Sequence, residues 1–89
     1  REYYTIIREL PAGKGFADVC MIPRKKHSDK PAVVIELKWD KSAVGAIEQI
    51  KEKQYGNALK EYQGNLLLVG INYNKMTKKH ECVIETMQK

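Results

Sequence analysis

The length, composition and charge of the chain restrict it to one small domain. Its 89 residues are 43% hydrophobic and 30% charged, as in a globular chain with one modest core. No apolar run approaches the roughly 20 residues that cross a bilayer, and two cysteines without Cys or His at zinc-finger spacing exclude a disulfide framework or a zinc finger. We therefore expect reduced thiols and a cytoplasmic protein.

The formal charge of +5 arises from 16 Lys and Arg against 11 Asp and Glu, and it gives a pI near 9.3. A basic surface attracts polyanions such as nucleic acid, although many small basic domains bind none. The chain has no initiator Met and opens abruptly on an apolar segment. We expect a single domain over residues 1–89 that is a fragment of a longer protein.

The first half of the chain predicts three strands. Residues 3–10 are rich in Tyr, Ile and Thr, and residues 16–22 and 32–38 are apolar runs of strand length. The segment "PAGKG" between the first two has turn chemistry. The polar loop "PRKKHSDKP" between the second and third is bracketed by prolines, which cannot donate to a β-ladder.

The second half predicts one helix and two further strands. Ser42 is a suitable N-cap for a helix over residues 43–62, whose apolar residues recur at helical spacing. Residues 65–73, "NLLLVGINY", predict a strand covered on both faces, and residues 81–86 an edge strand after a turn. This order predicts an α/β domain: a three-strand antiparallel meander, a crossover helix, and a mixed sheet that carries the helix.

The strand "VVIELKW" places an acid and a lysine, Glu36 and Lys38, in an otherwise apolar run. If Pro23 and Pro31 close the second hairpin symmetrically, paired residue numbers add to 54 and Asp18 lies across from Glu36. Opposed residues share a face of the sheet, and alternation adds Lys38 to that face. The sequence therefore predicts that two carboxylates and one ammonium converge.

The first hairpin extends this cluster. A turn at Gly13 and Lys14 pairs numbers that add to 27, which brings Glu9 opposite Asp18, although other glycine turns would shift this register. Glu9 is therefore a weaker candidate metal ligand, and a solvated hairpin residue is its plain alternative.

Opposed like charges destabilise a sheet unless they are compensated. Two compensations are open: a divalent cation between the carboxylates, or Lys38 bridging both. Oxygen ligands suit Mg²⁺ or Mn²⁺, which would activate water and neutralise charge on a phosphate oxygen. The plain alternative for Glu36 and Lys38 is a half-exposed ion pair worth about 0–1 kcal/mol.

These residues carry a resemblance to a known family. Asp18 in "GKGFADV", then "VVIELKW", a helix containing "AIEQIKEKQY" and the strand "LLLVGINY" resemble the PD-(D/E)XK nuclease superfamily over residues 4–73. More narrowly, the chain is similar to the bacterial nuclease domain found downstream of an ATPase-like domain. The resemblance implies a restriction-endonuclease-like fold from which the family's N-terminal helix is missing. The chain departs from the family pattern in one further respect, because Phe16 and Ala17 precede Asp18 where the family name implies a proline.

The resemblance implies a role for each matched residue. Asp18 and Glu36 would be metal ligands, the main-chain carbonyl of Leu37 a third, and Lys38 the catalytic lysine. Gln49 would border the active site from the helix, followed by Tyr55. Periodicity alone would instead centre the apolar stripe on Gln54, but a glutamine at the edge of a packed stripe reaches a cleft, and this favours Gln49.

The implied function is a Mg²⁺- or Mn²⁺-dependent endodeoxyribonuclease that leaves a 5′-phosphate, with a homodimer as the expected assembly. The alternatives are a catalytically inactive nuclease-fold module that binds nucleic acid or protein, and a structural fragment that pairs with another chain. Further residues have two readings each. The basic loop residues contact phosphate or are solvated: Lys14, Arg24, Lys25 and Lys26. His27 and His80 lie in loops without partners at ligand spacing, and we expect both at the surface. For Tyr3, Tyr4 and Trp39 a place in the core or in an interface is favoured over a platform for base stacking.

Overall fold

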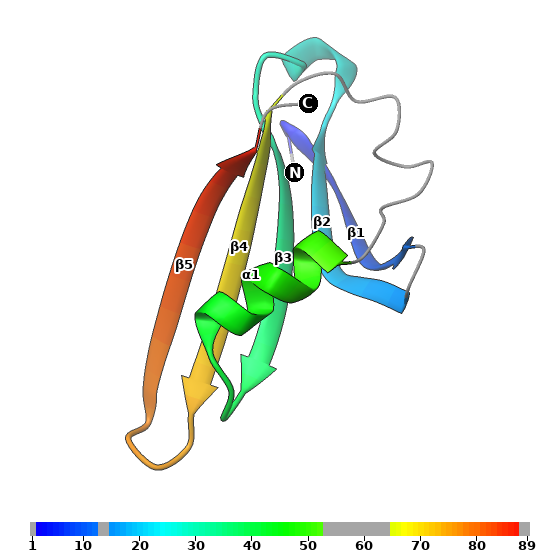
Figure 1. Cartoon of the computed structure of the whole chain (residues 1–89). Coiled ribbons are helices and arrows are strands. Elements are labelled where there is room, and N and C mark those ends of the chain that lie inside the picture. Colours follow the sequence, from blue (N-terminus) through cyan, green and yellow to red (C-terminus); the bar gives the residue numbers. More distant parts are fainter. Residues whose placement is uncertain (1, 13–14, 53–64, 88–89) are drawn as a thin grey trace.

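The computed structural model describes residues 2–12, 15–52 and 65–87, with the backbone alone at 9–12, 15–17 and 52. This part of the chain forms five strands, one α-helix and a short 3₁₀ turn (Figure 1). Their bounds are β1 (Tyr4–Ala12), β2 (Gly15–Pro23), η1 (Lys25–His27), β3 (Ala32–Trp39), α1 (Ala43–Glu52), β4 (Leu66–Asn74) and β5 (Lys79–Met87).

The five strands form one mixed sheet in the order of the sequence, β1-β2-β3-β4-β5. Strand β3 is parallel to β4, and α1 lies between them in the chain, whereas the other neighbouring strands are antiparallel. The predicted mixed α/β sheet with one helix is confirmed. The part of the expected helix beyond Glu52, with Tyr55 and Gln54, lies outside the described residues.

Both predicted hairpin registers are confirmed. In the first hairpin, Arg8 pairs with Val19 and the paired numbers add to 27. In the second, Cys20 pairs with Val34 and the numbers add to 54. In the second hairpin the register is the one expected if Pro23 and Pro31 bracket the loop symmetrically.

The loop between β2 and β3 is held by aromatic side chains. The Tyr4 hydroxyl donates to the Pro31 carbonyl at 2.9 Å, and the rings of Tyr3 and His27 meet edge to face at 4.5 Å between centroids. Tyr3 is 44% exposed and so lies outside the core. His27 is half-buried against the Tyr3 ring, and His80 is exposed.

Helix α1 crosses one face of the sheet over β3 and β4 (Figure 1). Its apolar stripe, Ala43, Ala46, Ile47 and Ile50, is buried as predicted. The helix approaches β4 most closely at Gly70, where a Cβ atom would lie 2.4 Å from the carbonyl oxygen of Ala43. The core beneath the helix consists of Cys20, Ala32, Val34, Ile47, Ile50, Leu66 and Leu68, with Ile7, Ile22 and Val83 at its border.

The two ends of α1 are attached to the edge strand β5. At the N-terminus, the Ala43 amide donates to Glu81 Oε1 at 3.0 Å, and the Gly45 amide donates to the capping Ser42 Oγ at 2.9 Å. Near the other end, Lys51 Nζ lies 2.6 Å from Glu85 Oε2. These contacts fix the position of the helix on the sheet.

The opposite face of the sheet has no helix over it in the part of the chain that the structure describes. Apolar side chains on this face are exposed, among them Ile6, Leu37 and Ile84. Trp39 is 60% exposed there, so of the two predicted places, core or interface, the core is excluded. None of the described helical segments has the length and apolar character needed to cross a membrane.

Candidate active site

The candidate site lies where β2 and β3 separate. Their ladder pairs residues 19–21 with residues 33–35 and ends there, so that Asp18 and Glu36 are the next residues on each strand. Beyond this point the first half of β2 bends away from β3 together with β1 (Figure 1). The Leu37 amide donates to Asp18 Oδ2 at 2.7 Å. A carboxylate thus takes the place of a backbone acceptor in the opening between the strands.

The three predicted site residues share the helix-covered face of the sheet. Cys20 and Val34 are paired and buried beneath α1. Because side chains alternate along a strand, Asp18 lies on the same face as Cys20, and Glu36 and Lys38 on the same face as Val34. Asp18 and Lys38 are half-buried, whereas Glu36 is only 4% exposed.

The burial of Glu36 follows from its neighbour on β4. Glu36 pairs with Gly70, the position at which α1 comes nearest to the sheet. The carboxylate is therefore largely removed from water on one side, while the opening beside Asp18 lies on the other. A desolvated carboxylate is costly unless a positive group or hydrogen bonds compensate it.

The lysine does not provide this compensation directly. In the described part of the chain, Lys38 forms no ion pair with Asp18 or with Glu36. Of the two compensations that the sequence left open, the bridging lysine is therefore not observed among the described residues, although Glu36 itself is not without a partner. Lys38 lies on the same face of the sheet as the carboxylates.

The donor set fits a hard, hydrated cation. The N–H and C=O of one residue in a strand point to the same side, so the Leu37 carbonyl faces the same opening as its amide. Two carboxylates and one carbonyl are oxygen ligands, and Mg²⁺ keeps several waters and takes few protein ligands. Among the described side chains, no three His, Cys, Asp or Glu residues gather into a richer metal site.

The remaining predicted site residues are less closely tied to this centre. Arg8 pairs with Val19 and Leu10 with Ala17, so the backbone of Glu9 lies across from that of Asp18. The side chain of Glu9 and all of Lys14 lie outside the described residues. Gln49 is half-buried on the flank of α1 and forms no hydrogen bond with either carboxylate. The strand register thus places Asp18, Glu36 and Lys38 on one face of the sheet, and Gln49 belongs to the helix that covers this face.

Sequence reasoning missed one buried polar residue beside the site. Asn72 pairs with Lys38 across β3 and β4, is 4% exposed, and accepts a hydrogen bond from the Lys41 amide at 2.8 Å. The signal was available, because Asn72 interrupts the apolar run "LLLVGINY". It lines a pocket of about 430 Å³ at the ends of β3 and β4, with Lys41, Ser42, Asn74, Thr77, Lys79, His80 and Glu81.

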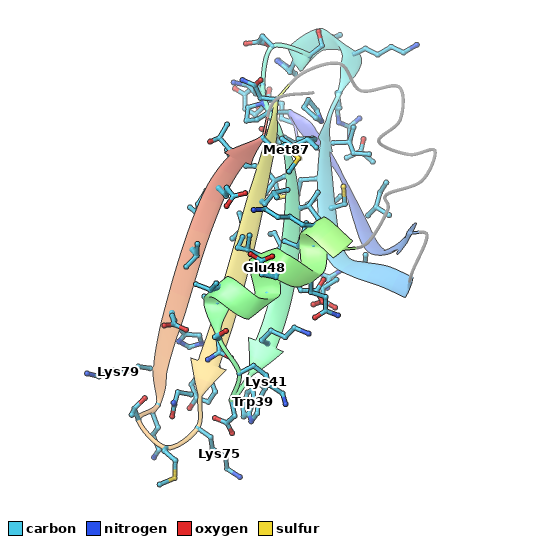
Figure 2. All side chains as sticks on the ribbon, in the orientation of Figure 1. Trp39, Lys41, Glu48, Lys75, Lys79 and Met87 are labelled. Atoms are coloured by element: carbon cyan, nitrogen blue, oxygen red, sulfur yellow. The ribbon has the colours of Figure 1, made fainter. Side chains whose placement is uncertain are left out.

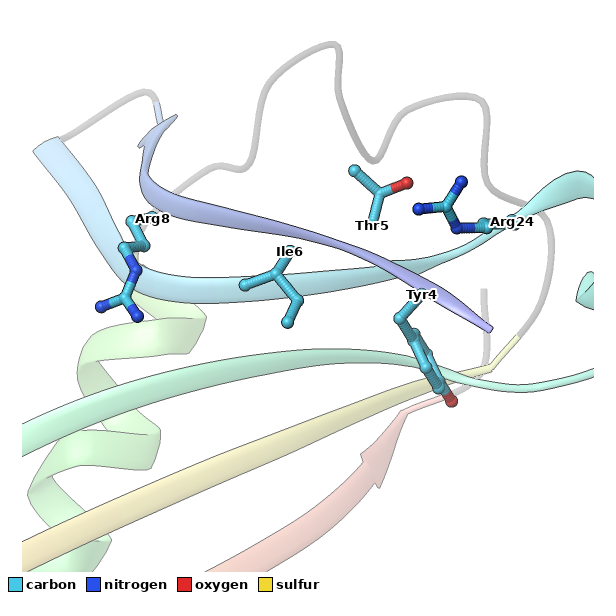
Figure 3. A pocket seen from close by; sticks show the side chains of 5 residues that line it. All are labelled: Tyr4, Thr5, Ile6, Arg8 and Arg24. Atoms are coloured by element: carbon cyan, nitrogen blue, oxygen red, sulfur yellow. The ribbon is translucent and has the colours of Figure 1, made fainter. Parts of the chain in front are cut away.

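A second pocket, of about 530 Å³, lies along the edge strand β1 (Figure 3). Two guanidinium groups, those of Arg8 and Arg24, line it together with Tyr4, Thr5 and Ile6. Of the basic loop residues predicted to meet phosphate or solvent, Arg24 therefore borders a cavity, whereas Lys25 and Lys26 are exposed in η1. None of the four residues Asp18, Glu36, Lys38 and Gln49 lines this pocket.

A family model described as the PD-(D/E)XK nuclease superfamily matches residues 1–83. No curated protein and no solved structure matches the chain. The matched segment contains β1 to β4 and the first half of β5, and therefore every residue of the candidate site.

Proposed function

The chain belongs to the PD-(D/E)XK nuclease superfamily, and we propose that it hydrolyses DNA phosphodiester bonds in a metal-dependent reaction. The observation that carries this proposal is the hydrogen bond from the Leu37 amide to Asp18. It holds one carboxylate at the opening between β2 and β3, next to the buried Glu36. The strand ladder alone would not place a charged side chain there.

Asp18, Glu36 and the Leu37 carbonyl would hold Mg²⁺ or Mn²⁺, with Glu9 as a further ligand. A divalent cation supplies charge neutralisation on a phosphate oxygen and activation of the attacking water. Asp18 is oriented by the Leu37 amide, and this limits its rotation before substrate binds. Glu36 is buried beside Gly70, where α1 approaches the sheet closely.

Lys38 would contribute a positive charge on the carboxylate-bearing face. Its ammonium would orient the attacking water and offset the charge that develops on the phosphate in the transition state. In-line attack would break the bond to the 3′ oxygen, and the products would be a 5′-phosphate and a 3′-hydroxyl. Gln49 borders the substrate from the flank of α1.

A cytoplasmic location, a homodimer and an upstream ATPase-like domain belong to the same proposal.

The test is nicking of supercoiled plasmid in Mg²⁺ or Mn²⁺. We expect Glu36→Gln and Lys38→Met each to reduce the nicking rate by about 100-fold or more. The first removes a proposed ligand of the cation, and the second removes a positive charge that would offset the charge developing on the phosphate. Glu48→Gln is the matched control, because it makes the same chemical change on the exposed side of α1 (Figure 2). If both site variants cut as fast as the parent chain, the proposed mechanism is wrong.

A further inference from the structure

Three aromatic rings lie side by side on the face of the sheet opposite α1. Trp39 pairs with Tyr73, and Tyr73 pairs with His80, so the rings form a row across β3, β4 and β5. Their centroids are 4.5 Å apart for Trp39 and Tyr73, and 4.8 Å apart for Tyr73 and His80. Trp39 ends the row beyond the ladder with β2, and most of its indole is open to solvent.

The row stands in a basic part of the molecule. We define the basic tip as residues 38–42 and 73–80, which contain five lysines and one aspartate. These two short segments hold a formal charge of +4 out of +5 for the whole chain. Figure 2 shows Trp39, Lys41, Lys75 and Lys79 at this same end of the sheet.

The basic tip is held in shape by the one acidic residue in it. Asp40 has a left-handed backbone with a φ of 52°, and its amide donates to the Tyr73 carbonyl at 2.8 Å. Its Oδ1 accepts a hydrogen bond from the Lys75 amide at 2.7 Å. The Asp40 carboxylate is therefore used within the tip, and it fixes the β4–β5 turn against the end of β3.

We propose that the aromatic row and the basic tip bind an unpaired strand of nucleic acid. Exposed rings on which bases stack, next to lysines that follow the phosphates, are the elements of single-strand binding sites. Trp39 directly follows Lys38 in β3, so a strand seated on the row leads around the end of β3 to the candidate active site. The inference rests on the proposed nuclease and narrows its substrate to DNA with a single-stranded segment beside the cut.

The charge of this surface argues against a protein partner. Protein interfaces are depleted in lysine relative to the rest of the surface, particularly at their centres. Here both segments of the basic tip contain lysines, and Lys41, Lys75 and Lys79 lie at the same end of the sheet as Trp39 (Figure 2). Each lysine that meets a phosphate releases counterions, which makes the affinity depend strongly on salt.

The test follows the fluorescence of the Trp39 indole, because Trp39 is the one tryptophan in the chain. Labelled 15-nucleotide oligo(dT) and a 15-base-pair duplex are titrated with the protein in EDTA, where no cutting occurs. We expect oligo(dT) to bind more tightly and to quench the indole fluorescence. Trp39→Ala should weaken oligo(dT) binding roughly 5- to 100-fold, and Ile84→Ala, an exposed apolar residue on the same face, should leave it unchanged.

The lysines are tested separately. Changing Lys75, Lys78 and Lys79 to Gln should reduce the slope of log affinity against log salt by about 2. Binding without quenching, equal affinity of Trp39→Ala, or a change in oligomeric state of Trp39→Ala without any oligo(dT) binding would each overturn the inference. A different result would refute the proposed nuclease activity alone: oligo(dT) would still quench the indole fluorescence, but the protein would not nick plasmid in Mg²⁺ or Mn²⁺.

Discussion

The seating of α1 on β4 is the feature that most directly connects stability to the candidate site. At Gly70, an added Cβ would meet the Ala43 carbonyl oxygen at 2.4 Å, the Ala46 Cβ at 3.0 Å and Ile47 Cγ1 at 3.1 Å. The first of these contacts involves backbone, so no side-chain rotation relieves it. In Gly70→Ala the helix must move away by at least about 0.6 Å to restore a contact of 3.0 Å.

This movement is opposed by the hydrogen bond of the Ala43 amide to Glu81. Overpacking in a core costs typically about 1–3 kcal/mol, and we expect Gly70→Ala to reach the upper end. About 3 kcal/mol corresponds to a fall in Tm of roughly 12–24 °C for a domain of this size. The assay is thermal unfolding followed by circular dichroism, with urea unfolding to obtain the free energy.

Gly45→Ala is the matched control in the same helix. Its Cβ would meet only the Ser42 Oγ, at 2.8 Å, and this side chain can rotate. Alanine gains up to about 1 kcal/mol of helix propensity, and disturbance of the Ser42 cap costs about as much, so Tm should change little. If Gly70→Ala melts within about 2 °C of the parent, α1 does not rest on β4 as described.

The remaining predictions concern pH, capping, metal and salt. Burial raises the pKa of the Cys20 thiol from 9.0 to about 11. Because the unfolded thiol ionises first, the free energy of unfolding should fall by about 1.4 kcal/mol per pH unit between pH 9 and pH 11, and an equal slope for Cys20→Ala in urea titrations would contradict this. Ser42→Ala removes the hydrogen bond to Gly45 and should cost about 1 kcal/mol in the same assay; an unchanged Tm would show that the cap is not formed. Mn²⁺ at about 100 times its Kd should stabilise the parent by about 2.7 kcal/mol and should leave Glu36→Gln unaffected; equal stabilisation of both would place the ion elsewhere. A hydrogen bond from Lys51 to Glu85 raises the pKa of this lysine, so Glu85→Gln should lower Tm slightly at low salt and not in 1 M NaCl, because exposed ion pairs are screened; a loss that persists at high salt would point to packing instead.

Much of the fold was predictable because local chemistry determines it. Prolines on both sides of the second loop gave the register of 54, and with it the common face of Asp18 and Glu36. Ser42 and the apolar spacing after it gave the start of α1 and its buried stripe. These features depend on residues close together in the sequence.

What could not be predicted depends on contacts between distant segments. The hydrogen bond from the Leu37 amide to Asp18 forms where β2 bends away from β3, and no pattern in the sequence predicts that bend. The aromatic row requires the parallel register of β3 and β4, which places Trp39 beside Tyr73. That register depends on the length and path of the whole crossover, so Trp39 by itself was read as a core or interface residue.

The attachment of α1 to β5 at two places has a consequence for local unfolding. Glu81 holds the N-terminus of the helix and Glu85 holds Lys51, so the helix is tied to an edge strand rather than to the central strands alone. Peeling β5 from the sheet removes both attachments at once. Amide hydrogens of α1 and β5 should therefore exchange with solvent deuterium as one cooperative unit, ahead of those in β3.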